Sequence, residues 1–567
     1  MPRYLITSAL PYISDAKHLG NLVGSMLPAD VYARFLRLRG KDVLYICATD
    51  EHGTPAELAA LHAGLEVSEY CRKQHEVLKG LCERFALSFD HFGRSSSPQN
   101  HELTKHFAAK LEEHGLIEER TTLQMFSVSE NRFLPDRYVI GTCPNCGYEA
   151  ARGDQCENCT TVLEPGELIN PRSSISGSTV LEMRETKHLF IRQSLVSDRL
   201  RSWILTHEDW PVLVRSIALK WLDEGIRDRS ITRDLKWGIP VDRPGFEGKV
   251  FYVWFDAPIE YIGATKEWSD LSPGSRDWRS WWYDAKDIQY VQFMAKDNIP
   301  FHTVTFPATI MGSAEPWKLV DYIKGFNWLN YYGGKFSTSA KRGVFMADAL
   351  ELLPSDYWRY QLMANAPEGA DVTFTWETFA DTVNKDLADT YGNFVNRVVK
   401  LVGLNFGSKV PSYGPIGDEA KDLLAGLREH LSAMTEFMEG MQFRKASQEL
   451  KATWALGNVY LDRTAPWKLM KTDIDAAGGV LAISLNLIRM FSIAALPFIP
   501  ETAGRTLSAV GVDPASARWI EGDLEGELHR ATPGTRIDDP GVLFAKVLPE
   551  NVAAWSARFS GSEQAKA

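Results

Sequence analysis

Residues 4–53 read YLITSALPYISDAKHLGNLVGSMLPADVYARFLRLRGKDVLYICATDEHG and contain a complete strand–helix–strand pattern. The apolar run Tyr4–Thr7 predicts a strand, and the helical spacing over Leu22–Leu36 predicts a helix that Gly40 ends. A second apolar strand is predicted at Val43–Ala48. Because parallel strands need a crossover of this length, the segment forms a parallel βαβ unit.

Beyond this unit, the alternation of strands and helices stops and later resumes. Short strand-like pieces and turns occupy Ile117–Asp228, and strand-like runs return at Val250–Phe255 and Ile288–Met294. From Asn384 helical periodicity dominates, with a further strand signal near Leu543–Val547. We therefore predict an α/β fold in which a split, doubly wound parallel sheet of the Rossmann type carries an inserted domain and precedes an all-α helix bundle.

Composition limits the class of protein. The 567 residues, 44% hydrophobic and 24% charged, suit a soluble chain of several domains. A net charge of −11 argues against nonspecific nucleic-acid packaging, although local basic patches can still bind RNA. The segment Met1–Tyr12 lacks the features of a signal peptide. The longest apolar stretch, Val480–Ile499, contains Asn486, Arg489 and Pro497, so a buried core helix is expected and not a membrane span. These features predict a cytoplasmic protein.

Four cysteines in the insert follow the spacing Cys143-x2-Cys146-x9-Cys156-x2-Cys159. Two CxxC pairs can present four thiolates to one tetrahedral zinc ion, and with no open ligand position the ion would be structural. A redox pair is the alternative. The inserted domain is therefore predicted to be a zinc knuckle. Three cysteines without this spacing are expected in the core, namely Cys47, Cys71 and Cys82.

The string Lys17-His18-Leu19-Gly20-Asn21 lies at a strand-to-helix turn. Free amides and a partial positive charge at a helix N-terminus suit phosphate, and Gly20 permits a flat base to approach the backbone. His18 and Asn21 can both donate hydrogen bonds to phosphate oxygens as negative charge develops. Taken alone, four such residues are also typical of an ordinary surface loop.

Longer strings around this turn resemble the class I methionyl-tRNA synthetase family. The resemblance is carried by Thr7–Tyr12 with His18–Asn21, which is similar to the "HIGH" motif, and by the blocks Ala48–Pro55, Tyr252–Ile259 and Lys296–His302. The four blocks occur in the order of the family. The resemblance implies ATP-dependent activation of L-methionine to methionyl-adenylate and transfer to the 3′ end of methionine tRNA.

The resemblance also implies a methionine pocket. Asp50 would bind the substrate ammonium, and the walls would be formed by Ala9, Leu10, Tyr12, Trp254, Ala257, Tyr261 and His302. Aromatic walls suit a polarizable thioether, and a buried ammonium needs a carboxylate partner. Any one of these aromatic residues taken alone could equally be an ordinary core residue. Near the ATP, the resemblance implies Arg233, Lys296 and Asp297.

A second string, Gly333–Ser339, resembles the family's "KMSKS" loop. Lys335 and Ser337 match it, but Thr338 stands where a second lysine is usual. A lysine here neutralises the ATP phosphates as pyrophosphate leaves. We expect Lys341 or Arg342 to reach the phosphates in its place.

The helical part resembles the family's anticodon-reading helices at Asn393, Arg397 and Trp467. Single-stranded bases are read by aromatic stacking and by donors to their edges. The partners implied are methionine, ATP with Mg²⁺, one structural Zn²⁺, and both initiator and elongator methionine tRNA. Because the chain stops soon after Leu543–Lys546, we expect a monomer.

Two alternatives remain open from the sequence. Thr338 favours a noncatalytic tRNA-binding paralogue, whereas the intact His18 motif argues against it. A class I synthetase for leucine, valine or cysteine is the other, but an insert of 117–228 leaves little room for an editing domain. The predicted divisions are 1–116 and 229–325 for the two halves of the catalytic domain, 117–228 for the zinc-bearing insert, 326–383 for the KMSKS-loop and stem-contact region, and 384–567 for the anticodon-binding bundle.

Overall fold

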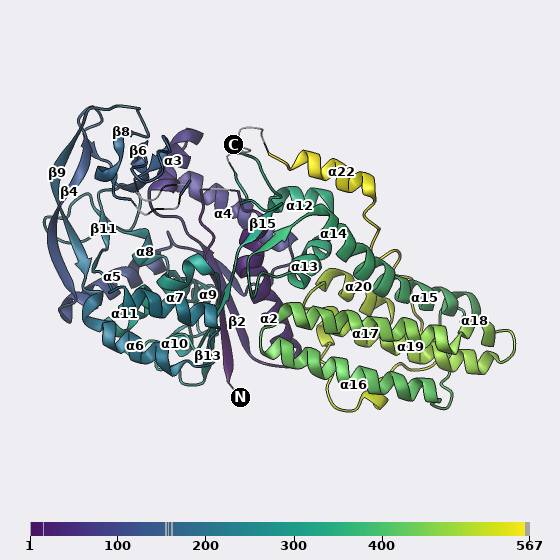
Figure 1. The fold of residues 1–567 in the computed structure, drawn as a ribbon. Helices are drawn as coiled ribbons and strands as arrows, with labels where there is room; N and C mark the ends of the chain where they lie inside the picture. The colour runs from purple at the N-terminus through teal and green to yellow at the C-terminus, as the bar shows by residue number, and fades with distance from the viewer. Residues whose placement is uncertain are drawn as a thin grey trace.

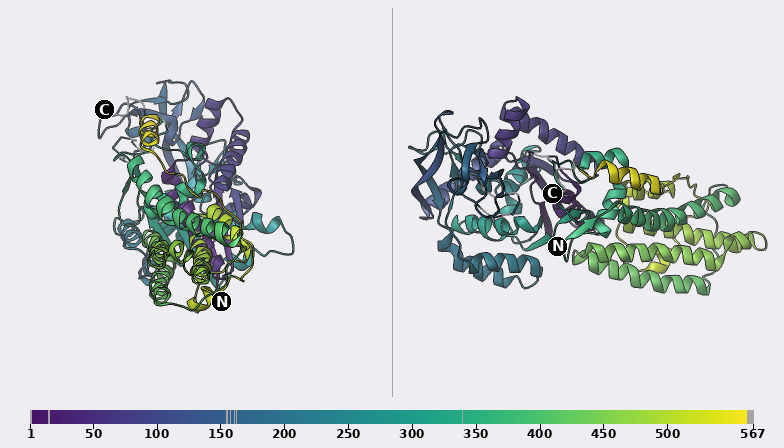
Figure 2. Two further views of the ribbon diagram at one scale, coloured as in Figure 1. Left: turned by 90° about the vertical axis from the view of Figure 1, so that its right-hand side faces the viewer. Right: turned by 45° about the horizontal axis from the view of Figure 1, so that its top comes forward.

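The computed structural model describes residues 2–561 except Asp15, Asp154, Gln155, Glu157, Thr160, Val162 and Ser339. Ser339, the last residue of the KMSKS-like string, therefore lies outside the described residues. The molecule is elongated, with an α/β part and a helical bundle placed end to end (Figure 1, Figure 2).

A parallel sheet forms the centre of the α/β part. Its strands, in spatial order, are β14 (Tyr322–Phe326), β13 (Ile288–Ala295), β1 (Arg3–Ser8), β2 (Val43–Thr49) and β3 (His91–Arg94). Each neighbouring pair is parallel, and β1 pairs with both β13 and β2. The chain thus winds away from β1 in both directions, which places a topological switch point between β1 and β13. The predicted split, doubly wound sheet is confirmed.

The helix after β1 is continuous but not uniform. It consists of α1 (Leu19–Asn21), the π-helical η1 (Leu22–Met26) and α2 (Leu27–Leu38). Pro28 has no N–H to donate back along the helix, and the π geometry occurs just before it. The other helices of this part are α3 (Thr54–Ala63), α4 (Val67–Arg84), α5 (Pro98–Glu113), α8 (Val253–Asp256), α9 (Glu260–Asp270), α10 (Arg279–Trp282) and α11 (Phe306–Gly312).

The insert contains two antiparallel sheets. One is built on the ribbon of β4 (Ile117–Ser127) and β9 (Leu181–Ile191), with β5 (Arg132–Phe133) and β10 (Arg229–Ser230) at its edges. The other is formed by β6 (Val139–Thr142), β7 (Ala151–Arg152) and β8 (Ile169–Ser173). The helices α6 (Ser197–Thr206) and α7 (Val212–Asp223) follow the ribbon.

Two predicted strands were wrong. In Val250–Phe255 only β12 (Val250–Phe251) is extended, because α8 begins at Val253. Periodicity alone cannot separate a buried strand from a buried helical turn in so short an apolar run. Leu543–Val547, all of it described, contains no strand. Its backbone is satisfied by side chains instead, since the Val547 N–H donates to Asn384 Oδ1 at 2.8 Å.

A small region links the sheet to the bundle. It contains β15 (Leu329–Tyr331), β16 (Val372–Phe374), α12 (Met346–Leu352), α13 (Ser355–Ala364), α14 (Trp376–Thr382) and the π-helical η7 (Val383–Gly392). The short strand β11 (Thr232–Arg233) lies elsewhere, paired with β12 and beside β9 of the insert. The bundle contains α15 (Asn393–Phe406), α16 (Asp418–Glu439), α17 (Phe443–Thr464), α18 (Pro466–Leu469), α19 (Ile474–Ala495), α20 (Pro500–Ala509) and α21 (Leu524–Glu527). The last helix, α22 (Pro549–Arg558), packs beside α14.

Helix α19 is long and apolar enough to cross a membrane by length and composition, but 89% of its most apolar window is buried inside the molecule. It packs against α15, α17, α18 and α20. The predicted buried core helix is therefore confirmed.

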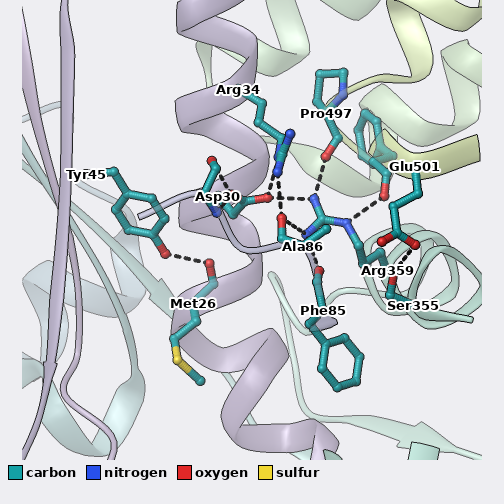
Figure 3. A network of polar contacts seen from close by, with 12 residues as sticks. Met26, Asp30, Arg34, Tyr45, Phe85, Ala86, Ser355, Arg359, Pro497 and Glu501 are labelled. Atoms are coloured by element: carbon teal, nitrogen blue, oxygen red, sulfur yellow. Dashed lines mark hydrogen bonds and ion pairs between the residues drawn. The ribbon is translucent and has the colours of Figure 1, made fainter. Parts of the chain in front are cut away.

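A buried ion pair joins the two parts of the molecule (Figure 3). Asp30 on α2 and Arg359 on α13 both have fully buried side chains, and Arg359 Nη2 lies 2.7 Å from Asp30 Oδ2. Arg359 also donates to the Pro497 carbonyl beyond α19, at 2.8 Å. Burial raises the pKa of Asp30, but the charges of Arg34 and Arg359 and the hydrogen bonds from Ser88 outweigh it and hold the pKa at about 2.

We expect Arg359→Met to lower the free energy of unfolding by about 3–5 kcal/mol at pH 7, because it leaves the Asp30 carboxylate buried with one partner fewer. Since the folded pKa of Asp30 lies below its ordinary value of 3.8, its stabilising contribution is present above that value and is lost as pH falls towards about 2. Urea denaturation measures both effects. The control is Lys385→Met, which removes an exposed ion pair with Asp381. Equal losses in the two variants would contradict the prediction.

Candidate active site

A cavity of about 590 Å³ opens at the carboxyl ends of the central strands, where the switch point predicts a ligand site. Ten of the residues singled out from the sequence line it: Ala9, Leu10, Tyr12, His18, Gly20, Asn21, Asp50, Trp254, Asp297 and Lys335. These residues come from five separate segments of the chain. The fold therefore brings together the strings that the sequence analysis treated one by one.

His18 is the N-cap of α1. Its Nδ1 accepts a hydrogen bond from the Asn21 N–H at 3.3 Å, and Asn21 Oδ1 accepts from the His18 N–H at 3.0 Å. The His18 ring stacks on Phe336 of the KMSKS-like loop, with ring centroids 4.6 Å apart. A Cβ on Gly20 would lie 2.9 Å from the His18 ring, so glycine is required for this packing. The reciprocal cap thus holds both predicted phosphate donors at one helix N-terminus.

Asp50 is a buried acid at the end of β2. No described group bonds its Oδ1. Burial raises the pKa of Asp50 well above the ordinary value, and the charges of Asp256 and Glu51 raise it further. A hydrogen bond from the His52 amide and the charge of Lys17 lower this pKa, but by less. A buried carboxylate oxygen without a partner is costly, so this site suits a cationic ligand group.

Three predicted pocket residues lie behind the cavity lining. Ala257, Tyr261 and His302 are buried. His302 Nδ1 donates to the Asn298 carbonyl at 2.9 Å, so its Nε2 accepts from the Tyr261 hydroxyl at 2.8 Å. Burial lowers the pKa of His302 to about 4, which keeps the ring neutral at pH 7.

Trp254 is 37% exposed at the cavity wall. Its ring stacks on Phe301, with centroids 4.0 Å apart. The sequence analysis missed Phe301, although it lies within the block Lys296–His302. One face of the Trp254 ring is therefore covered by Phe301.

Two lysines approach Trp328, which also lines the cavity. The ammonium of Lys296 lies 4.3 Å from the Trp328 ring centroid and that of Lys335 lies 5.5 Å from it. Lys296 also pairs with Asp371 at 2.7 Å. Trp328 was not expected from the sequence, and its position two residues after the end of β14 puts it at the ligand-binding edge of the sheet.

The KMSKS-like loop closes on itself through Arg342. The Ser337 and Arg342 backbones exchange hydrogen bonds at 3.0 and 2.9 Å. The Arg342 guanidinium donates to the Tyr331 and Lys335 carbonyls at 2.8 and 3.0 Å. Thr338 and Lys341 are exposed. Lys341 and Arg342 were the two basic residues expected to replace the second lysine. Of these, Arg342 already donates hydrogen bonds within its own loop, and Lys341 is exposed.

Arg233 does not line the cavity. Its guanidinium lies 3.6 Å from the centroid of the Tyr252 ring, and its Nε donates to Asp136 Oδ2 at 3.3 Å. Both partners do line the cavity, and Asp136 comes from the insert. Arg233 therefore fixes two wall residues from a position behind them.

The four cysteines of the insert come together. Their Sγ atoms all lie within 4.8 Å of one another, with 3.8 Å between Cys143 and Cys159 and 3.6 Å between Cys146 and Cys156. A tetrahedral zinc ion with Zn–S bonds of about 2.3 Å places its sulfur ligands about 3.8 Å apart. The cluster therefore fits a metal ion. Cys47, Cys71 and Cys82 are buried, as predicted.

Comparison with known proteins places this geometry in a family. Residues 4–399 match the model of "tRNA synthetases class I (M)", and residues 410–564 match the "Anticodon binding domain of methionyl tRNA ligase". The chain belongs to the methionyl-tRNA synthetase family. The predicted resemblance, fold class and enzyme class are thereby confirmed.

Relatives in the methionyl-tRNA synthetase family match along the whole chain. The methionine–tRNA ligase of Streptomyces avermitilis is 57% identical over 574 residues, covering 100% of both chains. That of Caulobacter vibrioides is 57% identical, covering 99% of this chain and 100% of its own. The structure of Mycobacterium tuberculosis methionyl-tRNA synthetase in complex with methionyl-adenylate has a TM-score of 0.77 and 25% identity, covering 96% of this chain and 100% of the other.

The three residues expected to read an anticodon lie together on the helical bundle. Arg397 on α15 places its guanidinium 5.1 Å from the ring centroid of Trp467 on α18, and pairs with Asp462 at 2.8 Å. Asn393 Nδ2 lies 3.4 Å from Asn458 Oδ1. In Figure 1, α18 lies at the end of the bundle far from the catalytic sheet.

Proposed function

We propose that the protein joins methionine to methionine tRNA in two steps within this cavity. The methionine carboxylate attacks the α-phosphorus of ATP, pyrophosphate leaves, and methionyl-adenylate forms. The terminal ribose hydroxyl of the tRNA then attacks the acyl carbon and AMP leaves. The observation that carries the proposal is the carboxyl of Asp50, whose Oδ1 has no hydrogen-bond partner among the described residues and which is buried in the same cavity as the capped helix N-terminus at His18.

The methionine site is proposed around Asp50, which receives the substrate ammonium. Trp254, Leu10, Ala9 and Tyr12 offer apolar walls to the thioether. Behind them, Tyr261 donates to a neutral His302, and Ala257 fills the adjoining space. Because these hydrogen bonds fix the tautomer of His302, the wall keeps one shape as methionine binds.

The ATP site is proposed between the helix N-terminus and the loop. His18 and Asn21 donate to the phosphates, and Gly20 keeps the His18 ring in place. Lys335 neutralises the departing pyrophosphate, and exposed Lys341 assists it in place of Thr338. Lys296, Asp297, Ser337 and Arg233 complete the set proposed to hold the nucleotide, and Mg²⁺ accompanies the ATP.

We propose that the cysteine cluster holds one structural zinc ion. The thiolates would fill all four positions of a tetrahedral ion, so the ion stabilises the insert and takes no part in the reaction.

A chelator-treated protein should therefore lose zinc and have a lower thermal midpoint. Elemental analysis should find about one zinc ion per chain, and Cys159→Ser should lower it severalfold. Cys71→Ser, a buried cysteine elsewhere, is the control. Full zinc content in Cys159→Ser would refute the site.

The tRNA is proposed to span the molecule. Its anticodon would stack on Trp467 and receive hydrogen bonds from Asn393 and Arg397, in both initiator and elongator methionine tRNA.

We also propose the division of the chain predicted from the sequence, a cytoplasmic location and a monomer. Light scattering checks the last point, since a monomer has a mass near 63.7 kDa.

Charging of tRNA transcripts tests the complete reaction. The protein should attach labelled methionine to a methionine tRNA transcript, and a changed anticodon should lower kcat/KM by more than about tenfold. If a changed anticodon leaves kcat/KM unaltered, the proposed anticodon-reading site is wrong. Failure to charge any transcript would remove the second step of the proposal.

A further inference from the structure

The last described segment, Pro549–Gly561, returns from the helical part to the catalytic loop. Figure 2 shows α22 at the junction of the two parts, and α22 packs beside α14. The chain then runs antiparallel to the loop, with a bridge between Arg342 and Ser560. The Gly343 N–H donates to the Phe559 carbonyl at 3.1 Å.

Side chains fasten this return segment to a rigid base. The rings of Trp555 and Phe559 lie 4.9 and 5.8 Å from the Trp376 ring. Arg558 forms ion pairs with Asp348 and Glu351 on α12, at 3.1 and 3.2 Å. Ring packing on Trp376 and ion pairs with α12 therefore fix the position of the segment where it reaches the loop.

A single hydroxyl group connects the segment to the beginning of the loop. Tyr332 Oη lies 2.8 Å from Ser556 Oγ and donates to Glu377 Oε2 at 2.7 Å. It also accepts from the Trp376 N–H at 3.2 Å. Tyr332 has a φ of 45°, in the left-handed region that a tyrosine rarely adopts, so these bonds hold a strained backbone.

The contacts continue from the segment to the helix N-terminus. Gly343, bonded to Phe559, lies directly under the Phe336 ring, since a Cβ there would be 2.2 Å from a ring carbon. Phe336 in turn stacks on His18. Arg342 ties the same stretch to the Lys335 carbonyl. Movement of the segment would therefore move the loop carrying Lys335 and the ring against His18.

We propose that Pro549–Gly561 positions the catalytic loop for the step in which the methionine carboxylate attacks ATP, with Tyr332 and Arg342 as the positioning residues. The proposal rests on the function proposed above. It assigns to a segment continuous with the anticodon-binding bundle an effect on the first chemical step, before tRNA takes part. In the part of the chain that the structure describes, neither Asp50 nor Trp254 has a hydrogen bond, ion pair or ring contact with this segment, so methionine binding is expected to be independent of it.

Gly561→Val tests the proposal at the point of closest approach. Gly561 has a φ of +85°, and a Cβ there would lie 2.9 Å from Arg342 Cβ and 3.1 Å from the Ala340 carbonyl oxygen. A branched side chain therefore forces the segment off the loop. Gly522→Val is the matched control, because Gly522 has the same φ of +85° with no atom within 4 Å of its Cβ position. Tyr332→Phe tests the hydroxyl connection independently.

Methionine-dependent ATP–pyrophosphate exchange is measured in each variant, with the thermal midpoint as a check of folding. Gly561→Val and Tyr332→Phe should lower kcat/KM for ATP by about tenfold and leave KM for methionine within about twofold. Gly522→Val should match wild type. If Gly561→Val and Tyr332→Phe both retain the kinetics of Gly522→Val, the segment does not position the loop. If wild type itself shows no exchange, the proposed function fails and this inference fails with it.

Discussion

Asp50→Asn is expected to lower kcat/KM for methionine in pyrophosphate exchange by about 10³-fold, or about 4 kcal/mol. The carboxyl is buried and its Oδ1 has no hydrogen-bond partner among the described residues, so it is placed to neutralise a substrate ammonium. An amide of the same shape cannot supply that charge. The loss should appear mainly in KM for methionine, with KM for ATP little changed.

The same variant separates a lost substrate contact from a damaged fold. Because burial and neighbouring acids raise the pKa of Asp50, its ionised form is unfavourable in the free protein, and Asn should not lower the thermal midpoint. In wild type, ammonium binding requires the ionised carboxylate, so KM for methionine should fall as pH rises through the raised pKa. A methionine KM within about threefold of wild type in Asp50→Asn would show that the ammonium binds elsewhere.

His18→Ala is expected to lower kcat of the exchange by about 10²–10³-fold, the usual cost of removing one donor to a developing oxyanion. KM for methionine should stay near the wild-type value, because His18 at the helix N-terminus is proposed to contact the ATP phosphates, while Asp50 receives the methionine ammonium. The rate of ATP–pyrophosphate exchange at saturating methionine measures this kcat.

His18→Asn distinguishes the two roles of the side chain. Asparagine is a good N-cap and can accept from the Asn21 N–H as His18 does, but it cannot reach as far or stack on Phe336. We expect His18→Asn to keep the thermal midpoint and still to be slow. Wild-type activity in His18→Asn would mean that His18 acts only as a cap.

Much of the fold and part of the site could be predicted because the signals are local. The βαβ unit appears in apolar runs and a helical period within residues 4–53, and the cysteine cluster appears in its spacing alone. Both depend on residues close together in the chain. The same holds for the His18 cap, whose two hydrogen bonds link residues three apart.

The rest depends on contacts between distant segments. Nothing near Phe336 or Trp328 in the sequence indicates that one stacks on His18 and the other lies beside two lysines. Arg233 matched a family position, but its place behind Asp136 follows only from how the insert folds back on the sheet. The segment at Leu543–Val547 gave a strand signal because its apolar residues are buried, while side chains satisfy its backbone.

Amino-acid-dependent ATP–pyrophosphate exchange, run on the purified protein with each of the twenty amino acids, tests the central claim most directly. We predict exchange with methionine and with none of the other nineteen, which would also show that Thr338 is tolerated in the loop. Exchange driven by a different amino acid would contradict the methionine site around Asp50. No exchange, with binding of methionine tRNA retained, would contradict catalysis itself.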